Sequence, residues 1–470
     1  MRLAQTELNS NALKLHNIPL ALLVERLRAR TLSSLVLTDH FLERIARLNT
    51  SLNAYMTVTA DSARDQAERA DWELVRGQDR GVLHGIPIAL KDNIDTKGVR
   101  TTRGAWSFRD HVPDSDAAVV QRLTEAGAVV LGKTAMHEFA YGMNGINPHF
   151  GATRNPWNLD MDAGGSSSGS AAAVAAGLAI AALGTDTGGS VRQPAHSCGV
   201  VGFKPSFGTI NQSGVYPLVP SMDHVGVIAQ TVSDTRAVFE QLLEKSNTSS
   251  TTLVRDLIHG QVTACDLLNM RLGIDRIAFF EGDSRVVGAI DHALAALQNL
   301  GAELVPLKTV ELTDALKDTR ATFSEANSLL WPLFETDRDL FGKDVAAKVL
   351  QARHLTHQDY QDAQRRRASY RQAIEQAFLL CDVLALPTST TAAAPINDRP
   401  KDHAHLAWRN CGLFNFTGHP AISIPAGRLG TGLPIGLMLV APLGQDARLL
   451  AMASGIEAVL PSIGRAPEHE

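Results

Sequence analysis

The segment that most constrains this chain is residues 160–194, which read DMDAGGSSSGSAAAVAAGLAIAALGTDTGGSVRQP. Two clusters rich in glycine and serine, 164–170 and 184–190, flank a run of small apolar residues. The small side chains at 171–176 predict a tightly packed buried helix, and the apolar run at 178–183 predicts a buried strand. Glycine lets the backbone of both clusters adopt conformations that other residues avoid.

Ser190 ends the second cluster, on a loop that can direct several backbone N–H groups toward one point. A hydroxyl beside such donors is what acyl transfer requires, because the reaction needs a nucleophile and a place for the oxyanion. The alternative is that both clusters are ordinary flexible turns, which are common in segments of this composition. The residues of the clusters alone leave both interpretations open.

Three segments in this order resemble the amidase signature family of serine hydrolases. GGSSSGSAAAVAAG and GTDTGGSVRQP are similar to the family's signature, and Ser166 and Ser190 stand at the separation of its two serines. Upstream, GIPIALKDN at 85–93 is similar to the segment that carries the family's catalytic lysine, here Lys91. In one departure, Ser168 stands where the family usually has glycine.

The resemblance implies a Ser-Ser-Lys variant of the serine-hydrolase triad, with Ser190 as nucleophile, Ser166 as bridging serine and Lys91 as base. It implies that the oxyanion is held by the backbone N–H groups of Thr187, Gly188, Gly189 and Ser190. Family members hold the bridging serine by a cis peptide bond, so the same is expected between Gly165 and Ser166.

The proposed base makes a structural prediction. A lysine with an ordinary pKa of about 10.4 is almost fully protonated at neutral pH, so a lysine base needs burial or a nearby positive charge. We therefore expect Lys91 to be buried. The alternative is a lysine that leaves the sheet for solvent or for a salt bridge with Asp92.

The resemblance also indicates a loop beside the substrate. Ala140, Tyr141 and Gly142 fall where family members bring such a loop against the bound molecule. A plain structural turn is the alternative. Flanking the nucleophile, Asp186 and Arg192 are expected to form an ion pair that braces the glycine loop.

The order of elements predicts an α/β fold. Helical spacing of apolar residues predicts helices over 18–30 and 34–48, with a third over 60–76, and apolar runs at 85–90 and 128–131 predict strands. The resemblance implies the amidase signature fold, in which helices cover both sides of a central mixed β-sheet.

The resemblance covers nearly the whole chain and implies one amidase domain over 1–470. Its expected parts are N-terminal helices at about 18–76, a catalytic core at about 80–232, a helical region covering the pocket at about 310–380, and C-terminal strands and a helix at about 383–460.

Between these parts the patterns give further local predictions. Residues 115–126 predict a helix opened by a Ser/Asp cap. Residues 272–277 and 302–307 predict strands around a helix at 284–299, and the polar segment 246–252 predicts an exposed loop.

Two other motifs compete with the amidase interpretation. Residues 127–134, GAVVLGKT, fit the phosphate-binding P-loop, but 128–131 are apolar enough to be a strand. Residues 165–169 fit the G-x-S-x-G elbow of α/β-hydrolases, which would make Ser167 the nucleophile of an esterase. That alternative leaves Lys91 and the second glycine loop without a role.

Neither a metal nor a cofactor is expected. His137 and Glu138 lack the second histidine of a zinc HExxH motif, because Tyr141 stands in its place. His403 and His405, in KDHAH, are expected to lie on a solvated loop. The scattered cysteines 198, 265, 381 and 411 favour neither a zinc site nor a disulfide framework.

The composition of the chain indicates which classes of partner it is expected to bind. The formal net charge is −5, and no basic stretch with interleaved aromatic residues indicates a nucleic-acid surface. No signal peptide or membrane span is evident, so a cytoplasmic location is expected. A small-molecule amide is the expected partner, with a homodimer as an option and with neither nucleic acid nor membrane.

The expected function is hydrolysis of a linear carboxamide or related C–N bond through an acyl-enzyme intermediate. The alternative is the A subunit of a glutamine-dependent aminoacyl-tRNA amidotransferase, which resembles this chain and uses the same triad to free ammonia from glutamine. Nothing in the sequence identifies the substrate.

Overall fold

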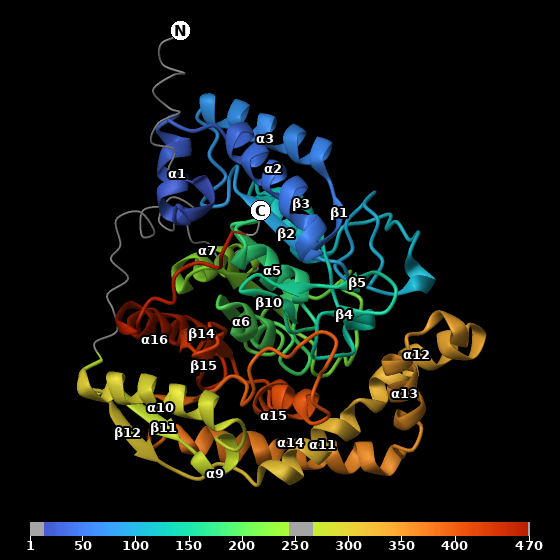
Figure 1. The fold of residues 1–470 in the computed structure, drawn as a ribbon, viewed down its shortest axis with the longest axis vertical. Helices are drawn as coiled ribbons and strands as arrows, with labels where there is room; N and C mark the ends of the chain where they lie inside the picture. The colour runs from blue at the N-terminus through green and yellow to red at the C-terminus, as the bar shows by residue number, and fades with distance from the viewer. Residues whose placement is uncertain (1–13, 244–266, 469–470) are drawn as a thin grey trace.

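A single large β-sheet runs through the computed structural model, which describes residues 14–243 and 267–468. Helices lie on both sides of this sheet (Figure 1). In order across the sheet, its eleven strands are β1 (Tyr55–Val58), β3 (Val129–Thr134), β2 (Pro87–Lys91), β8 (Ala181–Thr185), β10 (Val225–Ala229), β9 (Val201–Lys204), β14 (Ala421–Arg428), β15 (Pro434–Val440), β13 (Val383–Pro387), β11 (Arg271–Ile274) and β12 (Glu303–Pro306).

The sheet is mixed, as predicted. β2 pairs in parallel with both β3 and β8, and β11 pairs in parallel with both β13 and β12. The strands between these two groups pair antiparallel, from β8 through β10, β9, β14 and β15 to β13. Strands from the start, middle and end of the chain therefore share one sheet, and the assignment of residues 1–470 to one domain stays a prediction.

The central strands are covered on both faces. Every residue of β2, β8, β10 and β13 is buried. Successive side chains of a strand point to opposite faces of its sheet, so burial of all of them means that both faces are packed. Because both faces of these strands are buried, their sequences are mainly apolar runs without polar alternation.

The helices agree with the periodicity of the sequence to within a few residues at most ends. They are α1 (Leu20–Arg28), α2 (Ser34–Leu52), α3 (Ala60–Val75), α4 (Ala118–Glu125), α5 (Ser168–Ala175), α6 (Arg192–Cys198), α7 (Val232–Leu242), α9 (Arg276–Phe279), α10 (Ser284–Asn299), α11 (Leu312–Thr322), α12 (Ser324–Thr336), α13 (Lys343–Ala352), α14 (His357–Ala377), α15 (His403–Phe416) and α16 (Asp446–Val459). The C-terminal strands that are predicted within about 383–460 correspond to β13, β14 and β15.

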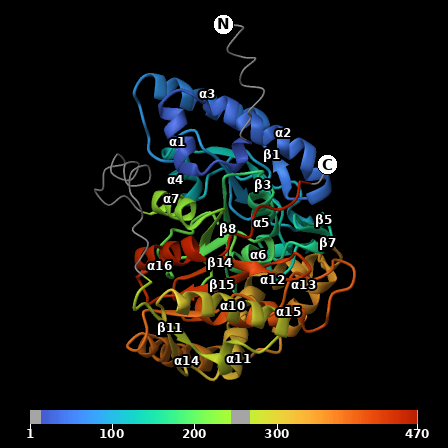
Figure 2. The ribbon, with the colours of Figure 1, turned by 60° about the vertical axis from the view of Figure 1, so that its left-hand side comes forward.

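Two pairs of short strands and a layer of terminal helices complete the architecture. The short strands are β4 (Ile146–Asn147), β5 (Gly151–Ala152), β6 (Arg154–Asn155) and β7 (Asn158–Asp162). Figures 1 and 2 show α2 and α3 at one end of the molecule and α11 and α14 at the opposite end. No helix of the described residues has the length and apolar character that are needed to cross a bilayer.

The central helix α5 is buried on every side. All of its residues from Ser168 to Ala175 are buried, and most of them are alanine, serine or glycine. At Gly169 the approach is closest, since a Cβ there would lie 2.2 Å from the carbonyl oxygen of Ala54 and 2.4 Å from the amide nitrogen of Ala135. The small residues of the first cluster thus let a helix pack directly on the backbone of its neighbours.

Three local predictions differ from the structure or lie outside it. Helix α4 begins at Ala118 without a side-chain cap, because the Asp116 carboxylate instead accepts the N–H of Lys97 at 2.7 Å. Strand β11 ends at Ile274, before the predicted 277, because Asp275 accepts the N–H of Ala278 and starts α9. The predicted loop at 246–252 lies outside the described residues.

Candidate active site

Lys91 is the last residue of β2 and is fully buried, so the prediction of its burial is confirmed. Its Nζ lies 2.8 Å from Ser166 Oγ and 2.8 Å from Thr185 Oγ1, with the Thr185 carbonyl oxygen at 3.4 Å. β2 and β8 pair in parallel, which brings the ends that carry Lys91 and Thr185 to the same edge of the sheet. Asp92 is not the partner of this amine.

Burial lowers the pKa of Lys91 to about 7, against the opposing charges of Asp186 and Asp223. About half of such a lysine is neutral at pH 7. A neutral amine has two N–H donors and one lone pair. The two oxygens of Thr185 can accept both donors, and the lone pair can then accept the Ser166 hydroxyl proton.

Ser166 lies directly before α5, and the peptide bond between Gly165 and Ser166 is cis, as expected. The Gly165 N–H donates to Gln193 Oε1 at 2.9 Å, and the Ser166 carbonyl accepts the N–H of His137 at 3.2 Å. A Cβ at Gly165 would lie 2.2 Å from the Asn144 carbonyl oxygen. Glycine is therefore required where this turn passes the neighbouring backbone.

Ser190 stands at the start of the turn that leads into α6, and only 3% of its surface is exposed. Its carbonyl accepts the N–H of Ser167 at 3.1 Å, so the two serine clusters are joined through their backbones. The Ser190 hydroxyl is directed at Met143 Sδ, 3.9 Å away. A hydrogen bond between the hydroxyls of Ser190 and Ser166 is absent from the described contacts, so the second step of the expected relay is not formed in this structure.

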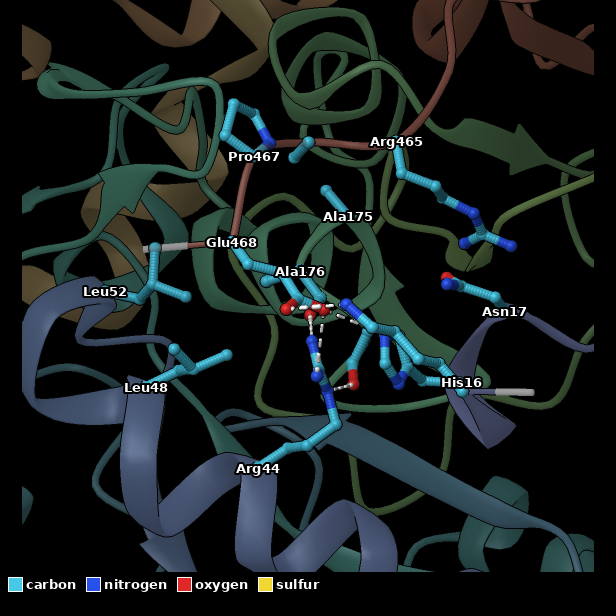
Figure 3. Close-up of a pocket in the computed structure, with 13 residues that line it drawn as sticks. His16, Asn17, Arg44, Leu48, Leu52, Ala175, Ala176, Arg465, Pro467 and Glu468 are labelled. Carbon is cyan, nitrogen blue, oxygen red and sulfur yellow. Dashed lines mark hydrogen bonds and ion pairs between the residues drawn. The ribbon is translucent and has the colours of Figure 1, made fainter. Parts of the chain in front are cut away.

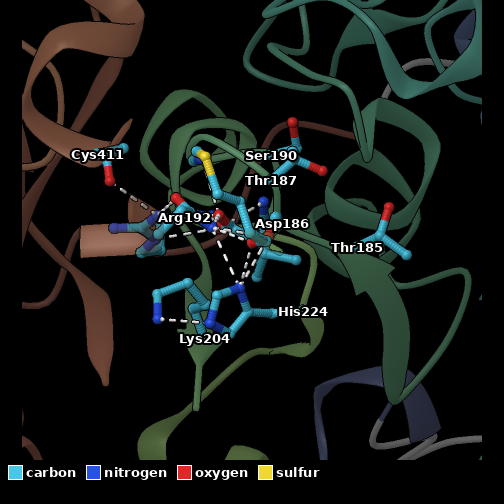
Figure 4. Close-up of polar contacts among 12 residues, drawn as sticks. Thr185, Asp186, Thr187, Ser190, Arg192, Lys204, His224 and Cys411 are labelled. Atoms are coloured by element: carbon cyan, nitrogen blue, oxygen red, sulfur yellow. Dashed lines mark hydrogen bonds and ion pairs between the residues drawn. The ribbon is translucent and has the colours of Figure 1, made fainter. Parts of the chain in front are cut away.

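Asp186 organises the loop that carries Ser190 (Figure 4). Its carboxylate accepts the N–H of Gly189 at 2.7 Å and that of Val191 at 3.1 Å, and it pairs with Arg192 at 2.8 Å. The predicted ion pair is therefore confirmed. Burial alone would raise the pKa of Asp186, but the Arg192 guanidinium holds that pKa far below its ordinary value. The loop is thus built around a permanent negative charge.

The four expected oxyanion donors do not behave alike. The N–H of Gly189 is engaged by Asp186, whereas those of Thr187, Gly188 and Ser190 make no hydrogen bond with the residues that the structure describes. The Thr187 hydroxyl donates to Asp223 Oδ1 at 2.6 Å, which fixes the first part of the loop. Three donors are therefore left available for an oxyanion.

Several residues of the site carry no signal that sequence reasoning used. Thr185 stands inside the quoted GTDTGG stretch, but its contact with Lys91 depends on strand pairing. Asp223 and Asn415 are distant in sequence and lie in segments without a motif. Asn415 donates to the Asp186 carbonyl at 2.7 Å, and Lys204 lies 3.4 Å from His224 under the same loop.

The segment from Ala140 to Gly142 is held by the helical region rather than by the sheet. Ala140 has a φ of 59°, and the Tyr141 ring stacks on Phe323 with centroids 5.5 Å apart. The Tyr141 carbonyl accepts from Lys348 Nζ at 2.6 Å. Met143, which follows this segment, reaches Ser190. Contact of residues 140–142 with a substrate stays a prediction.

The two competing motifs do not have the geometry that they require. Residues 129–134 of the P-loop pattern are β3, and Lys133 is buried and donates to Ile94, Thr96 and Thr101 rather than toward a phosphate. Ser167 is also buried, and its hydroxyl bonds the Thr185 carbonyl at 3.2 Å. It therefore faces β8 and not an open nucleophile elbow.

The histidines form no metal centre in the described parts of the chain, where no group of three or more His, Cys, Asp or Glu side chains is placed to hold an ion. His137 instead pairs with Asp344 at 3.2 Å. The expectation of a solvated loop at His403 and His405 is wrong, because α15 begins at His403 and buries it against the Ala392 carbonyl at 2.9 Å. His405 is exposed and contacts Arg320.

Comparisons with known proteins identify the family. The family model described as Amidase matches residues 36–450. The chain is 36% identical over 462 residues to a protein from Prochlorococcus marinus (strain MIT 9313) that is named as the A subunit of glutamyl-tRNA(Gln) amidotransferase. This match covers 91% of the present chain and 94% of the relative.

Two solved structures share the fold. A crystal structure of an amidase has a TM-score of 0.85 at 32% identity and covers 94% of this chain and 100% of its own. A peptide amidase from Stenotrophomonas maltophilia has a TM-score of 0.79 at 30% identity, with 94% of this chain and 96% of its own covered.

The relatives correct the expectation about partners, which was a small-molecule amide, a homodimer as an option, and neither nucleic acid nor membrane. The Prochlorococcus protein is by its name one component of an amidotransferase for glutamyl-tRNA(Gln). The expectation was wrong because it rested on the net charge and the basic patches of this chain, which carry no information on whether the chain is one subunit of a larger enzyme. The fold, the family model and the relatives agree in one respect: this chain belongs to the amidase signature family, whose enzymes act on C–N bonds.

Proposed function

We propose that the chain cleaves a carboxamide C–N bond with Ser190 as nucleophile, Ser166 as proton relay and Lys91 as base. The observation that carries this proposal is the fully buried Lys91 amine, hydrogen-bonded to Ser166 Oγ at 2.8 Å and with its pKa lowered to about 7. Burial disfavours the charged form of the amine, so this lysine can accept a proton from Ser166 at neutral pH.

The first half of the reaction forms an acyl-enzyme. Ser190 Oγ attacks the amide carbon, its proton passes to Ser166, and the Ser166 proton passes to the Lys91 amine. The negative charge on the carbonyl oxygen is stabilised by the N–H groups of Thr187, Gly188 and Ser190, each worth about 10²–10³ in rate. For this relay the Ser190 hydroxyl must rotate from Met143 toward Ser166.

The second half releases the products. The C–N bond breaks as the nitrogen takes a proton from Ser166, which is resupplied by Lys91, and ammonia or an amine departs. Water then attacks the ester carbon and gives up its proton along the same relay, which frees the acid and restores Ser190. Over the two halves, one amide and one water molecule are consumed, one acid and one amine or ammonia are released, and the triad returns to its starting protonation state.

The biological setting that the relatives favour is the A subunit of a glutamine-dependent tRNA amidotransferase. The support is the 36% identity to the Prochlorococcus protein of that name over 91% of this chain. In that setting the amide is the side chain of glutamine, and the released ammonia is used to amidate glutamyl-tRNA(Gln). The likeness to a peptide amidase at 30% identity favours a second candidate, a hydrolase that needs no transfer partner.

The triad is tested by Ser190→Ala. This variant should lose amide hydrolysis by at least about 10²-fold because no hydroxyl remains to form the ester. Ser168→Ala is the matched control, since Ser168 is a buried serine of the same clusters whose hydroxyl reaches only the Ala135 carbonyl, at 3.4 Å. Ammonia release measures both. Turnover by Ser190→Ala, with the folded state verified by circular dichroism, would refute the assignment.

The amidotransferase proposal is tested separately by supplying the other subunits of such an enzyme. The purified chain should release ammonia from glutamine slowly when alone, and the assembled complex should convert glutamyl-tRNA(Gln) to glutaminyl-tRNA(Gln) with glutamine as donor. Efficient hydrolysis of simple amides without any transfer to tRNA by the mixture would favour the second candidate instead.

A further inference from the structure

A cavity of about 300 Å³ lies at the end of α5 opposite Ser166, and Lys14 and Glu468, the first and last residues that the structure describes, line it (Figure 3). Its walls include His16, Arg44, Ala176 and Arg465, and Glu468 reaches into it. An adjoining cavity of about 440 Å³ shares Lys14, His16, Arg44 and Glu468 and adds His40, Glu43 and Arg47. Volumes of this size are typical of small-molecule sites.

A carboxylate already sits in this cavity. Glu468 lies 2.8 Å from Lys14 Nζ and 3.4 Å from both Arg44 Nη1 and His16 Nε2. The hydrogen bond from Lys14 lowers the pKa of Glu468 to about 2. The side chain belongs to an extended segment and is 37% exposed. The contacts that hold it are those of its carboxylate with Lys14, Arg44 and His16. It marks where an anionic group binds.

The groups around this carboxylate are mainly positive. The cavities are lined by Lys14, Arg44, Arg47 and Arg465, against the acidic side chains of Glu43 and Glu468. Burial lowers the pKa of His16 to about 3 and that of His40 to about 4, so both imidazoles are neutral. A positive cavity that exceeds a carboxylate in size can take a larger anion.

Arg44 is the fixed part of the site. It is 7% exposed, and its Nε and Nη2 donate to the carbonyls of Gly177 at 2.9 Å and Ala176 at 2.8 Å. Its Nη1 is left with Glu468 alone, at 3.4 Å. This geometry presents one preorganised nitrogen, Nη1, to the cavity, where it can donate a charge-assisted hydrogen bond to an anion.

Arg465 supplies a second positive group. It lines the same cavity, on the side of Asn17 (Figure 3), and forms no ion pair or hydrogen bond within residues 14–243 and 267–468. The more distant charge of Asp234 acts on it without a direct contact. An arginine with free N–H donors beside one that holds a carboxylate gives two anchors separated by open volume.

From this arrangement we infer a second ligand site, for a small dicarboxylate. One carboxylate of the ligand replaces Glu468 between Lys14 and Arg44, and the other meets Arg465. The site is separate from the amidase site, yet Arg44 also holds the carbonyls of Ala176 and Gly177, which directly follow α5, and the first turn of α5 follows Ser166. Binding of a ligand at the second site therefore affects the end of the helix whose other end follows the bridging serine.

Calorimetric titration with succinate tests the site without any need for turnover. Succinate should bind the wild type saturably. Glu468→Gln should bind it at least about threefold more tightly, because a tethered competitor has lost its charge. Lys14→Gln and Arg465→Gln should each bind it at least about threefold more weakly, because each removes one positive anchor. Both side chains are exposed, so these variants avoid the folding risk of replacing Arg44.

Further titrations separate this site from its alternatives. Ser190→Ala should bind succinate with unchanged affinity, and so should Lys97→Gln, which removes an exposed charge elsewhere. Acetate should bind more weakly than succinate and be indifferent to Arg465→Gln. Absence of saturable heat in both the wild type and Glu468→Gln would overturn the inference. So would equal succinate affinity in Arg465→Gln, or tighter binding of inorganic phosphate than of succinate.

Discussion

At the scale of single residues, the proposed mechanism depends on where one amine is placed. Lys91 differs from the exposed lysines of the chain by full burial and by three oxygens within hydrogen-bonding distance of its nitrogen. Loss of hydration disfavours the charged form, and no carboxylate of the described residues contacts the nitrogen to restore it. The side chain is therefore suited to accept a proton at neutral pH.

The rate of amide hydrolysis should rise with pH through about 7 and level off above it, because the neutral form of Lys91 is the base and its pKa is lowered to about 7. Lys91→Met should lower kcat at pH 8 by about 10²–10⁴-fold and abolish this inflection. Steady-state rates between about pH 5.5 and 9 measure both effects, since this window brackets the lysine titration.

Lys97→Met is the control, because Lys97 is an exposed lysine a few residues along the same segment. It should keep the wild-type profile. An inflection near pH 7 that persists in Lys91→Met would assign the titration to another group and remove Lys91 from the mechanism.

At the scale of elements, α5 shows how small residues set the distance between the catalytic segments. The helix starts within two residues of Ser166 and packs on the backbone of Ala54 and Ala135 at Gly169. A larger side chain at this position must push the helix away from its neighbours. By contrast, the helices α2 and α10 are amphipathic and bury one face.

Gly169→Ala should lower the free energy of unfolding by about 1–3 kcal/mol, because overpacking outweighs the gain of up to about 1 kcal/mol in helix propensity. Gly288→Ala, within α10, is the matched control because a Cβ there meets nothing within 4 Å. It should stabilise the protein by up to about 1 kcal/mol. Urea unfolding of both variants provides the comparison, and stabilisation of Gly169→Ala would contradict the packing of α5.

At the scale of the whole molecule, the helical region at about 310–380 is tied to the serine loop by a few contacts. Lys348 on α13 holds the Tyr141 carbonyl at 2.6 Å, and Glu138 accepts the N–H of Gly342 at 3.0 Å. These contacts fix the segment before Met143, and Met143 Sδ in turn lies 3.9 Å from the Ser190 hydroxyl. Elements far from the sheet can thereby influence the site.

Lys348→Met should lower kcat/KM while leaving the free energy of unfolding within about 1 kcal/mol, because it releases residues 140–142 without opening the core. Lys343→Met is the control, since Lys343 is exposed on the same helix. Steady-state kinetics give kcat/KM and urea unfolding gives the free energy of unfolding for both variants. Unchanged kinetics in Lys348→Met would mean that residues 140–142 are a structural turn.

Local patterns were sufficient for most of the fold, whereas the roles of Lys91, Ser166 and Ser190 were predicted from the resemblance to the amidase signature family. Burial on both faces leaves an uninterrupted apolar run, as in β8, and an amphipathic helix leaves a helical period, as in α2. The exceptions arose where a side chain was engaged elsewhere: Asp116 does not cap α4, and Gly189 gives its N–H to Asp186.

By itself, then, the sequence determined the glycine and serine clusters and the α/β order of the elements, since each is encoded within a few neighbouring residues. Only the tertiary structure decided that Thr185, Asp223 and Asn415 support the site and that Glu468 occupies a basic cavity. The physical reason is that hydrogen bonds and desolvation depend on distances between atoms, which strand pairing and helix packing set between segments far apart in the chain.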